Sequence, residues 1–305
     1  MNKIVIVGCG NVGMSYAYAL VNQKCNVDEL ILIDINKNKA SGEAEDLNHS
    51  IPYSPNNICI KAGDYPDCKD ASIVMIAAGA NQNIGETRLD LIHKNTAIFQ
   101  NVISSVMASG FNNIFLIATN PVDAMSYITY KHSHLSASKI IGTGTSLDTA
   151  RLRYILSRKF EISPKNVHAY VLGEHGDSEF VAWSSAMIGS VKIDTMLTKE
   201  EKDTISEEVR NSAYEIIKKK GNTSYGIGMC LVRITNAILN DENAIITVSA
   251  LDKDAYISSP CIINKKGIKR RLKIDLTNEE QELYDKSKKV IKNLSLIHIS
   301  EPTRP

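Results

Sequence analysis

Short apolar runs alternate with helical patterns along the first half of the chain. The runs Lys3–Val7, Glu29–Ile33, Ser72–Ala77 and Asn113–Ala118 are five or six residues long and mainly apolar, which is typical of strands buried on both faces. A stretch with helical character, Met14–Asn22, follows soon after the first run. Strands that alternate with helices predict a parallel sheet with crossover helices, the α/β class.

The first apolar run leads directly into a glycine pattern. Gly8, Gly10 and Gly13 form G-x-G-x-x-G between the predicted strand and helix. Glycines at these places permit a tight turn, a close approach of the backbone to a pyrophosphate and close packing of helix on strand. The N–H groups that begin the helix would face the phosphates. A glycine-rich turn in an ordinary α/β protein is the alternative, so the interpretation depends on the flanking elements.

An acidic residue ends the second predicted strand and strengthens the nucleotide interpretation. Asp34 follows Gly13 by 21 residues, where a carboxylate can accept both ribose hydroxyls and would repel a 2′-phosphate. Lys37 and Lys39 lie close enough to weaken this preference without reversing it. The pattern therefore predicts a Rossmann-type, doubly wound parallel sheet that binds NAD rather than NADP.

The pattern changes part-way along the chain and predicts two domains. Residues 1–142 are expected to form the NAD-binding domain, and residues 143–293 an α+β domain that holds the substrate. The second part contains a long predicted helix, Glu200–Lys220, and a late strand pair around Ala244–Ser249 and Pro260–Asn264. A chain of 305 residues is long enough for two domains, each with its own core.

The composition limits the partners of the chain. Its 35 basic and 34 acidic residues give a net charge of +1, so no overall field attracts nucleic acid or an anionic membrane. The densest basic run, Lys265–Arg271, is interrupted by apolar residues and is more typical of a solvated hairpin. Six cysteines lack metal-ligand spacing, and no apolar stretch reaches the ~20 residues that span a bilayer. The first strand begins almost at Met1, which leaves no signal peptide, so we expect a cytoplasmic protein without a metal.

Two segments of the second half carry the candidate chemistry. Leu147–Arg151 supplies Asp148 and Arg151, and Gly173–Asp177 supplies His175. A carboxylate can orient and charge an imidazole, a guanidinium can bind a substrate carboxylate with two hydrogen bonds, and the imidazole can exchange a proton with a substrate oxygen. Each residue also has a structural alternative: His175 could be a core histidine, and Asp148 could simply pair with Arg151 across one helical turn.

With both halves considered, the chain resembles the L-lactate and malate dehydrogenase family, and within it the bacterial L-lactate dehydrogenases. The resemblance covers nearly the whole length to about Lys292. It depends on several motifs in order: Gly8–Gly13, Gly42–Leu47, Ala80–Gln82, Gly85–Leu89, Thr119–Asp123, Leu147–Arg151 and Gly173–Asp177.

The resemblance implies a role for each matching catalytic residue. His175 would be the general acid in reduction of a 2-keto acid and the base in the reverse direction. Asp148 would hold its tautomer and stabilise the imidazolium, while Arg151 would bind the substrate carboxylate. Arg88, whose structural alternative is a surface residue at a helix start, would lie on a closing loop and polarise the reacting carbonyl. The hydride would come from the cofactor.

The resemblance also implies which positions line the cofactor and the substrate. Gln82, Asn120 and Thr223 would contact the substrate. The expected cofactor-binding positions are Gly8, Gly10, Val12, Gly13, Asp34, Lys39, Gly79, Thr119 and Asn120.

The identity of residue 82 favours lactate over malate. Malate enzymes of the family have an arginine at the position of Gln82, because a second substrate carboxylate is costly to bury without a cation. A neutral amide suits pyruvate, and larger apolar 2-keto acids remain open. The alternatives are a malate or broader 2-hydroxy-acid dehydrogenase and, from a different class, a catalytically silent NAD-binding subunit.

A regulatory site is implied as well. Many bacterial lactate dehydrogenases are activated by fructose 1,6-bisphosphate bound between subunits, and the matching cations are Arg153 and His168. In the homotetramer that the resemblance implies, these cations would repel their symmetry mates until a bisphosphate neutralises them. The alternative is a surface arginine and a partly exposed histidine without a ligand. The implied role is the allosterically controlled, fermentative reduction of the pyruvate made in glycolysis.

Two segments depart from the family pattern. The hairpin after Val248–Ala250 is several residues shorter than usual, because Ala250–Asp252 runs straight into Lys253–Ile257. Residues 294–305 are unrelated to the family and match the in-frame translation of a sequencing adapter. We therefore expect the final helix to begin near Glu279, and residues 294–305, a non-native tail, not to pack as part of the domain.

Overall fold

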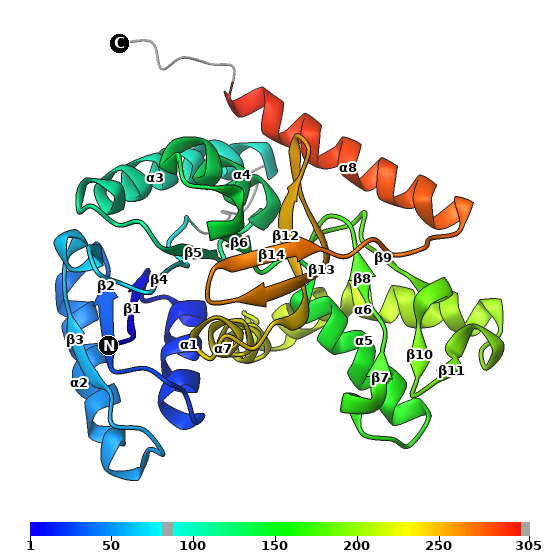
Figure 1. Cartoon of the computed structure of the whole chain (residues 1–305), viewed down its shortest axis with the longest axis horizontal. Helices are drawn as coiled ribbons and strands as arrows, with labels where there is room; N and C mark the ends of the chain where they lie inside the picture. Colours follow the sequence, from blue (N-terminus) through cyan, green and yellow to red (C-terminus); the bar gives the residue numbers. More distant parts are fainter. Residues whose placement is uncertain (81–87, 300–305) are drawn as a thin grey trace.

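Parallel strands form the first part of the central sheet, as the apolar runs predict. The structure, a computed structural model, describes residues 1–80 and 88–299. The parallel strands are β1 (Lys3–Val7), β2 (Glu29–Ile33), β3 (Cys59–Ala62), β4 (Ile73–Ile76), β5 (Ile114–Ile117) and β6 (Ile140–Gly142). They lie in the order β3-β2-β1-β4-β5-β6, with every neighbouring pair parallel (Figure 1). The order runs outward from β1 in both directions, which is the doubly wound arrangement.

Three antiparallel strands extend the same sheet beyond β6. These strands are β12 (Ala244–Asp252), β13 (Ala255–Asn264) and β14 (Gly267–Arg271), and within the described residues they complete a sheet of nine strands. The junction is a single antiparallel pairing of Ser249 with Gly142. The predicted strand pair therefore exists and is longer than predicted, and it continues the sheet of the first half of the chain.

Helices cover both faces of the parallel strands, because successive side chains of a strand point to opposite faces. Ile4 and Ile6 share a core with α1 (Asn11–Asn22), α2 (Lys37–Ser50) and α7 (Tyr225–Leu239). Val5 and Val7 share the opposite core with α3 (Arg88–Ala108) and α4 (Val122–Ser133). Helices α1 and α7 lie side by side, although more than 200 residues separate them (Figure 1).

The remaining elements form a smaller unit beside the end of the sheet. Helix α5 (Ser146–Lys159) follows β6, and α6 (Lys199–Lys220) confirms the predicted long helix almost to the residue. Helix α8 packs against α4 and β13 (Figure 1). It extends over Asn278–Ile299, so residues 294–299 continue the helix, whereas their side chains and residues 300–305 lie outside the described part. The short strands are β7 (Val167–His168), β8 (Val171–Leu172), β9 (Phe180–Val181), β10 (Met187–Ile188) and β11 (Val191–Lys192).

Both late hairpins are tight and charged. Lys253 and Asp254 form the turn between β12 and β13, with Lys253 in the left-handed region at φ 61°. Arg271 on β14 pairs with Asp252 at 2.8 Å, and Lys288 on α8 reaches the same carboxylate at 2.9 Å. The basic run 265–271 covers the second turn and β14, and most of its basic side chains are exposed, as predicted.

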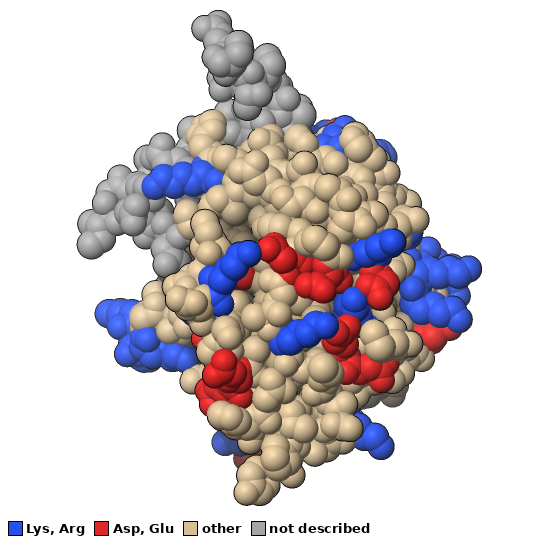
Figure 2. All heavy atoms as spheres, turned by 90° about the vertical axis from the view of Figure 1, so that its left-hand side faces the viewer, with Lys and Arg blue, Asp and Glu red and all other residues tan. Residues whose placement is uncertain are grey.

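Charges of both signs are mixed over the surface. On the face in Figure 2, basic and acidic side chains lie next to one another. Exposed pairs such as Lys37 with Asp64, 2.8 Å apart, belong to this balance. Among the helices of residues 1–80 and 88–299, none is both long and apolar enough to cross a bilayer.

Candidate active site

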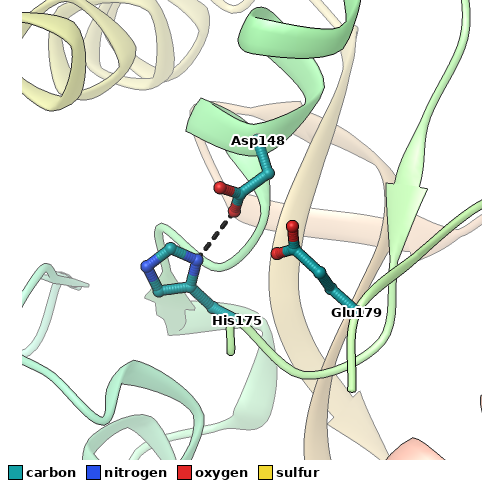
Figure 3. Close-up of side chains that lie close together, drawn as sticks. All are labelled: Asp148, His175 and Glu179. Atoms are coloured by element: carbon teal, nitrogen blue, oxygen red, sulfur yellow. Dashed lines mark hydrogen bonds and ion pairs between the residues drawn. The ribbon is translucent and has the colours of Figure 1, made fainter. Parts of the chain in front are cut away.

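Asp148, His175 and Arg151 meet at the beginning of α5. The Nδ1 atom of His175 lies 2.7 Å from Oδ2 of Asp148 (Figure 3). Nη1 of Arg151 donates to Oδ1 of the same carboxylate at 2.7 Å. The sequence offered two interpretations, an Asp148–Arg151 pair or an Asp148–His175 pair. Both occur together, because the carboxylate uses one oxygen for each partner.

Burial and charge set the proton affinity of this group. The Asp148 side chain is 3% exposed and that of His175 is 25% exposed. Burial alone would lower the pKa of His175, but contact with Asp148 outweighs burial and raises the pKa to about 9. Burial opposes ionisation of Asp148 as well, yet His175 and Arg151 together hold its pKa below the ordinary value. Near pH 7 the imidazole is therefore charged and the carboxylate ionised.

The backbone around β6 places Asp148 where its charge is favoured. Gly144 turns the chain between β6 and α5 with φ +49°, and a Cβ there would lie 2.6 Å from the backbone N of Ser249. Asp148 follows in the first turn of α5. The unpaired N–H groups of a helix start favour a negative charge at this place.

The loop that holds His175 is tied to three distant elements. It joins β8 to β9. Gly173 exchanges backbone hydrogen bonds with Ser258 on β13, and the N–H of Glu174 donates to Oγ of Ser287 on α8 at 2.6 Å. The N–H of His175 donates to Oδ2 of Asp123 on α4 at 2.9 Å. Three consecutive N–H groups therefore fix the loop before the imidazole begins.

Asp123 is a functional candidate that the sequence analysis missed. It is 3% exposed, and besides the N–H of His175 it accepts the hydroxyl of Ser249 on β12. Burial raises the pKa of Asp123 to about 6, against these hydrogen bonds. Within the motif Thr119–Asp123, the sequence analysis gives roles to Thr119 and Asn120 but none to Asp123. The available signal was a carboxylate on a helix otherwise lined by buried small and apolar side chains.

A third carboxyl group, Glu179, points towards Asp148 from the end of the same loop (Figure 3). One ligand-type atom from each of Asp148, His175 and Glu179 lies within 4.8 Å of the others. Such a cluster has the spacing of a metal site, which the sequence does not predict. The guanidinium of Arg151 already contacts Asp148 and opposes a further positive charge there.

The glycine loop has the geometry that the sequence predicts. Gly8 adopts φ +105°, and a Cβ there would lie 2.5 Å from the backbone N of Ala78. A Cβ on Gly13 would lie 2.0 Å from the carbonyl oxygen of Gly8, so the close packing of α1 on β1 requires glycine. Nothing lies within 4 Å of a Cβ built on Gly10, which is the N-cap of α1 and gives it no side-chain cap. Val12 packs partly buried against the adjacent core.

Asp34 closes the other side of this loop. Its Oδ2 accepts the N–H of Cys9 at 2.8 Å and its Oδ1 accepts the N–H of Asn36 at 2.9 Å. The carboxylate is thus held at the end of β2 beside the glycines. Lys39 lies in the first turn of α2, where its N–H donates to the capping side chain of Asn36.

The loops after β4 and β5 meet through a second residue that the sequence analysis missed. Asn95 on α3 is 1% exposed; its Oδ1 accepts the N–H of Ala80 at 2.8 Å, and its Nδ2 donates to the carbonyl of Asn120 at 3.0 Å. The Thr119 hydroxyl donates to the carbonyl of Ala78 at 2.8 Å. A Cβ on Gly79 would lie 2.7 Å from Thr119 Cγ2. The predicted positions 79, 119 and 120 are therefore brought together at the carboxyl edge of the sheet.

Three predicted site residues, Gln82, Arg88 and Thr223, are placed less completely. Gln82 lies outside the described residues, and Arg88, predicted on a closing loop, is described only as the first residue of α3. Thr223 lies half-buried between α6 and α7. The roles of all three residues stay predictions.

The two predicted effector residues lie on neighbouring elements, Arg153 on α5 and His168 at the end of β7. Nε of Arg153 donates to the carbonyl of Ala169 at 3.3 Å, directly after the exposed His168. The guanidinium also stacks over Tyr170, 5.4 Å from the ring centroid. Burial lowers the pKa of Arg153 from its ordinary value.

Comparison with known proteins agrees with this geometry over almost the whole chain. Residues 2–142 match the lactate/malate dehydrogenase NAD binding domain, and residues 145–296 match the lactate/malate dehydrogenase alpha/beta C-terminal domain. The chain belongs to the lactate/malate dehydrogenase family. It is an NAD-dependent oxidoreductase.

Individual members of the family are similar along almost their full length. An L-lactate dehydrogenase of Halalkalibacterium halodurans is 51% identical over 299 residues, and L-lactate dehydrogenase 2 of Bacillus cereus is 49% identical over 304 residues; 96% of each chain is covered. The ligand-bound crystal structure of minor L-lactate dehydrogenase from Enterococcus mundtii is 41% identical, with a TM-score of 0.96 and coverage of 98% of this chain and 99% of that one.

The residues present in this chain fit the NAD of the family. The N-cap of α1 makes no side-chain hydrogen bond, and a Cβ built on Gly10 would meet no described atom within 4 Å, so a pyrophosphate could approach the N–H groups of the helix start. The Asp34 carboxylate is held by two backbone N–H groups, and its remaining lone pairs can accept ribose hydroxyls. Asp34 and the glycine loop would therefore hold the adenosine and pyrophosphate parts of the cofactor.

The position of His175 should depend on Asp123. Asp123→Ala removes the acceptor of the His175 N–H and leaves that donor unsatisfied, which costs about 1–3 kcal/mol. We expect kcat to fall about tenfold or more, since about 1.4 kcal/mol of lost transition-state stabilisation is a factor of ten. Asp123→Asn, which keeps an acceptor oxygen, should retain most of kcat.

Steady-state NADH oxidation and denaturant unfolding would be measured for both variants. Ser249→Ala is the matched control, because it removes the other partner of Asp123 and leaves the bond to His175 in place. Wild-type kcat in folded Asp123→Ala protein would contradict the positioning role.

Proposed function

We propose that the chain is an NAD-dependent L-lactate dehydrogenase, which reversibly reduces pyruvate to L-lactate with NADH. The observation that carries the proposal is the Asp148–His175–Arg151 group, which combines a charged proton donor with a carboxylate-binding guanidinium. Relatives that are about half identical over 96% of each chain are named L-lactate dehydrogenases. A cytoplasmic role in fermentation, consuming the pyruvate of glycolysis, follows from this activity.

Arg151 binds the substrate carboxylate in this proposal. Its Nη1 donates to Asp148, and the other N–H groups of the planar guanidinium, which have no partner among the described residues, can form a two-pronged contact with a carboxylate. Because Asp148 fixes one edge of the guanidinium, the substrate is oriented relative to the imidazole as well. Asn120 and Thr223 contribute further polar contacts to the substrate, as the resemblance implies.

His175 moves the proton. Its Nδ1 contacts Asp148, so Nε2 is the atom that faces the substrate and donates a proton to the carbonyl oxygen as the alcohol forms. NADH, when bound, supplies the hydride to the carbonyl carbon. Asp148 stabilises the imidazolium before transfer, and Arg88, the first residue of α3, polarises the carbonyl. In lactate oxidation neutral His175 accepts the same proton.

Gln82 selects the substrate in this proposal. Pyruvate ends in a methyl group, whereas oxaloacetate carries a second carboxylate that a neutral amide leaves unpaired. The competing proposal is a malate or broader 2-hydroxy-acid dehydrogenase. A catalytically silent NAD-binding subunit is the weaker alternative, since Asp148, His175 and Arg151 are all present and in contact.

Substrate preference tests the function and the selector together. NADH oxidation should be faster with pyruvate than with oxaloacetate, and Gln82→Arg should reverse the order by supplying the cation. Gln281→Arg on the exposed face of α8 is the control for an added charge. A preference of the unmodified chain for oxaloacetate would support malate dehydrogenase, and absence of turnover with both would support the silent subunit.

Arg153 and His168 form the proposed effector site for fructose 1,6-bisphosphate in a homotetramer. Arg153 is anchored to Ala169 and Tyr170, which places a fixed cation beside the exposed His168. A cationic pair close to its symmetry mate would be relieved by a doubly phosphorylated ligand. If the bisphosphate binds the assembled, active form preferentially, its binding favours both assembly and activity.

Arg153→Gln should abolish stimulation by fructose 1,6-bisphosphate and leave turnover at saturating pyruvate intact. Arg158→Gln, an exposed arginine in the last turn of the same helix, is the matched control and should keep the stimulation. Activity and sedimentation velocity would be measured with and without the bisphosphate. Equal stimulation in both variants would remove Arg153 from the effector site.

A further inference from the structure

Glu179 is a buried ionisable group that the proposed mechanism does not use. It ends the loop that begins at Gly173, immediately before β9, and is 6% exposed. Its N–H donates to the carbonyl of Gly176 at 3.1 Å, so a tight turn carries the side chain back over the loop. The carboxyl group consequently points at Asp148 rather than at solvent (Figure 3).

The hydrogen-bond donors of this cluster contact Asp148 rather than Glu179 among the described residues. Asp148 receives Nδ1 of His175 and Nη1 of Arg151, each at 2.7 Å. Glu179 faces Asp148 itself, with its oxygen, an Asp148 oxygen and a His175 nitrogen all within 4.8 Å. Two buried carboxyl groups at this separation do not both ionise readily, and the proton goes to the group with fewer donors. That group is Glu179.

The charges on the surrounding elements agree with this assignment. Helix α5 contributes Asp148 and Arg151, helix α4 contributes Asp123, and helix α7 contributes the thiol of Cys230. Glu174 lies on the same loop and accepts the Ser178 hydroxyl. Arg151 and protonated His175 are cations near both carboxyl groups, and each lowers the pKa of Glu179. Burial and the negative charge of Asp148 both raise the pKa of Glu179.

We propose that Glu179 is a neutral carboxylic acid that donates a hydrogen bond to Asp148 and acts as a positioning residue for the Asp148–His175 pair. This inference rests on the proposed roles of Asp148 and His175 in lactate dehydrogenase catalysis. It explains how a second buried carboxyl group can lie beside the Asp148–His175 pair without adding a second negative charge there.

Neutral Glu179 keeps the proton-donating state electrically balanced. Asp148 and the substrate carboxylate carry one negative charge each, and Arg151 and protonated His175 carry one positive charge each. Asp123, ionised above a pKa of about 6, and Arg88 add one further charge of each sign. An ionised Glu179 would add an uncompensated charge in a buried site. It would also bind the His175 proton more tightly and make that proton harder to donate to the substrate.

Two substitutions of Glu179 distinguish a neutral from an ionised group by the direction in which the apparent pKa of pyruvate reduction shifts. Glu179→Gln replaces one neutral donor by another, so the apparent pKa in the pH profile of pyruvate reduction should stay within about half a unit of the wild-type value. Glu179→Leu removes the donor, leaves Asp148 a stronger acceptor, and should shift that pKa upwards by about half a unit to one unit. Loss of an ionised group would instead shift the pKa downwards in both variants.

A spectroscopic measurement covers the case in which Glu179→Leu does not fold. At about pH 8 the difference infrared spectrum of wild-type protein minus Glu179→Gln protein should contain the C=O stretching band of a protonated carboxyl group. Glu280→Gln is the control, because Glu280 is also buried and accepts hydrogen bonds, but at the start of α8. Absence of the band from the wild-type spectrum, or a downward pKa shift in Glu179→Gln, would overturn the proposal.

Failure of the underlying function has a different signature. If His175 is not the proton donor, His175→Gln keeps its turnover of pyruvate, whatever the Glu179 variants show. If His175 is the donor and only the Glu179 assignment is wrong, His175→Gln loses turnover by about two to four orders of magnitude, while Glu179→Gln moves the pH profile downwards.

Discussion

The hydrogen-bonded ion pair between Asp148 and His175 constrains the rest of the site. It joins the first turn of α5 to the loop between β8 and β9, which meet only because several elements hold them in place. Removing either partner would leave a charge or a polar group buried in a region with little solvent. The same carboxylate fixes Arg151, so the proton donor and the substrate-binding cation share one support.

The surrounding elements hold this contact in place by hydrogen bonds to backbone N–H groups of the loop that carries His175. The N–H groups of Gly173, Glu174 and His175 bond to β13, α8 and α4, so the antiparallel extension, the last helix and the nucleotide-binding half all position one imidazole. The single pairing of Ser249 with Gly142 makes the sheet continuous across the two halves. Ser249 also contacts Asp123, and sheet continuity and loop position are thereby coupled.

Local patterns made much of this predictable from sequence. Buried parallel strands are continuous apolar runs, and the turn after β1 requires glycine at positions 8 and 13 because backbone atoms fill the space of a Cβ. The partners Asp123, Asn95 and Ser287 were not predicted, because each acts across a long sequence separation that one sequence does not reveal. The attachment of β12 to β6 escaped prediction for the same reason. The alternatives for Asp148 were not exclusive, since a carboxylate has two oxygens.

The most direct test of the account measures the pKa of His175 with and without the charge of Asp148. Imidazole NMR signals would be followed through a pH titration in the wild-type chain and in Asp148→Asn, with the pH profile of pyruvate reduction recorded in parallel. The account predicts a wild-type pKa of about 9 and a clearly lower pKa in Asp148→Asn, because Asp148 is the main group that raises the pKa against burial. A His175 pKa that is the same in both proteins would contradict it.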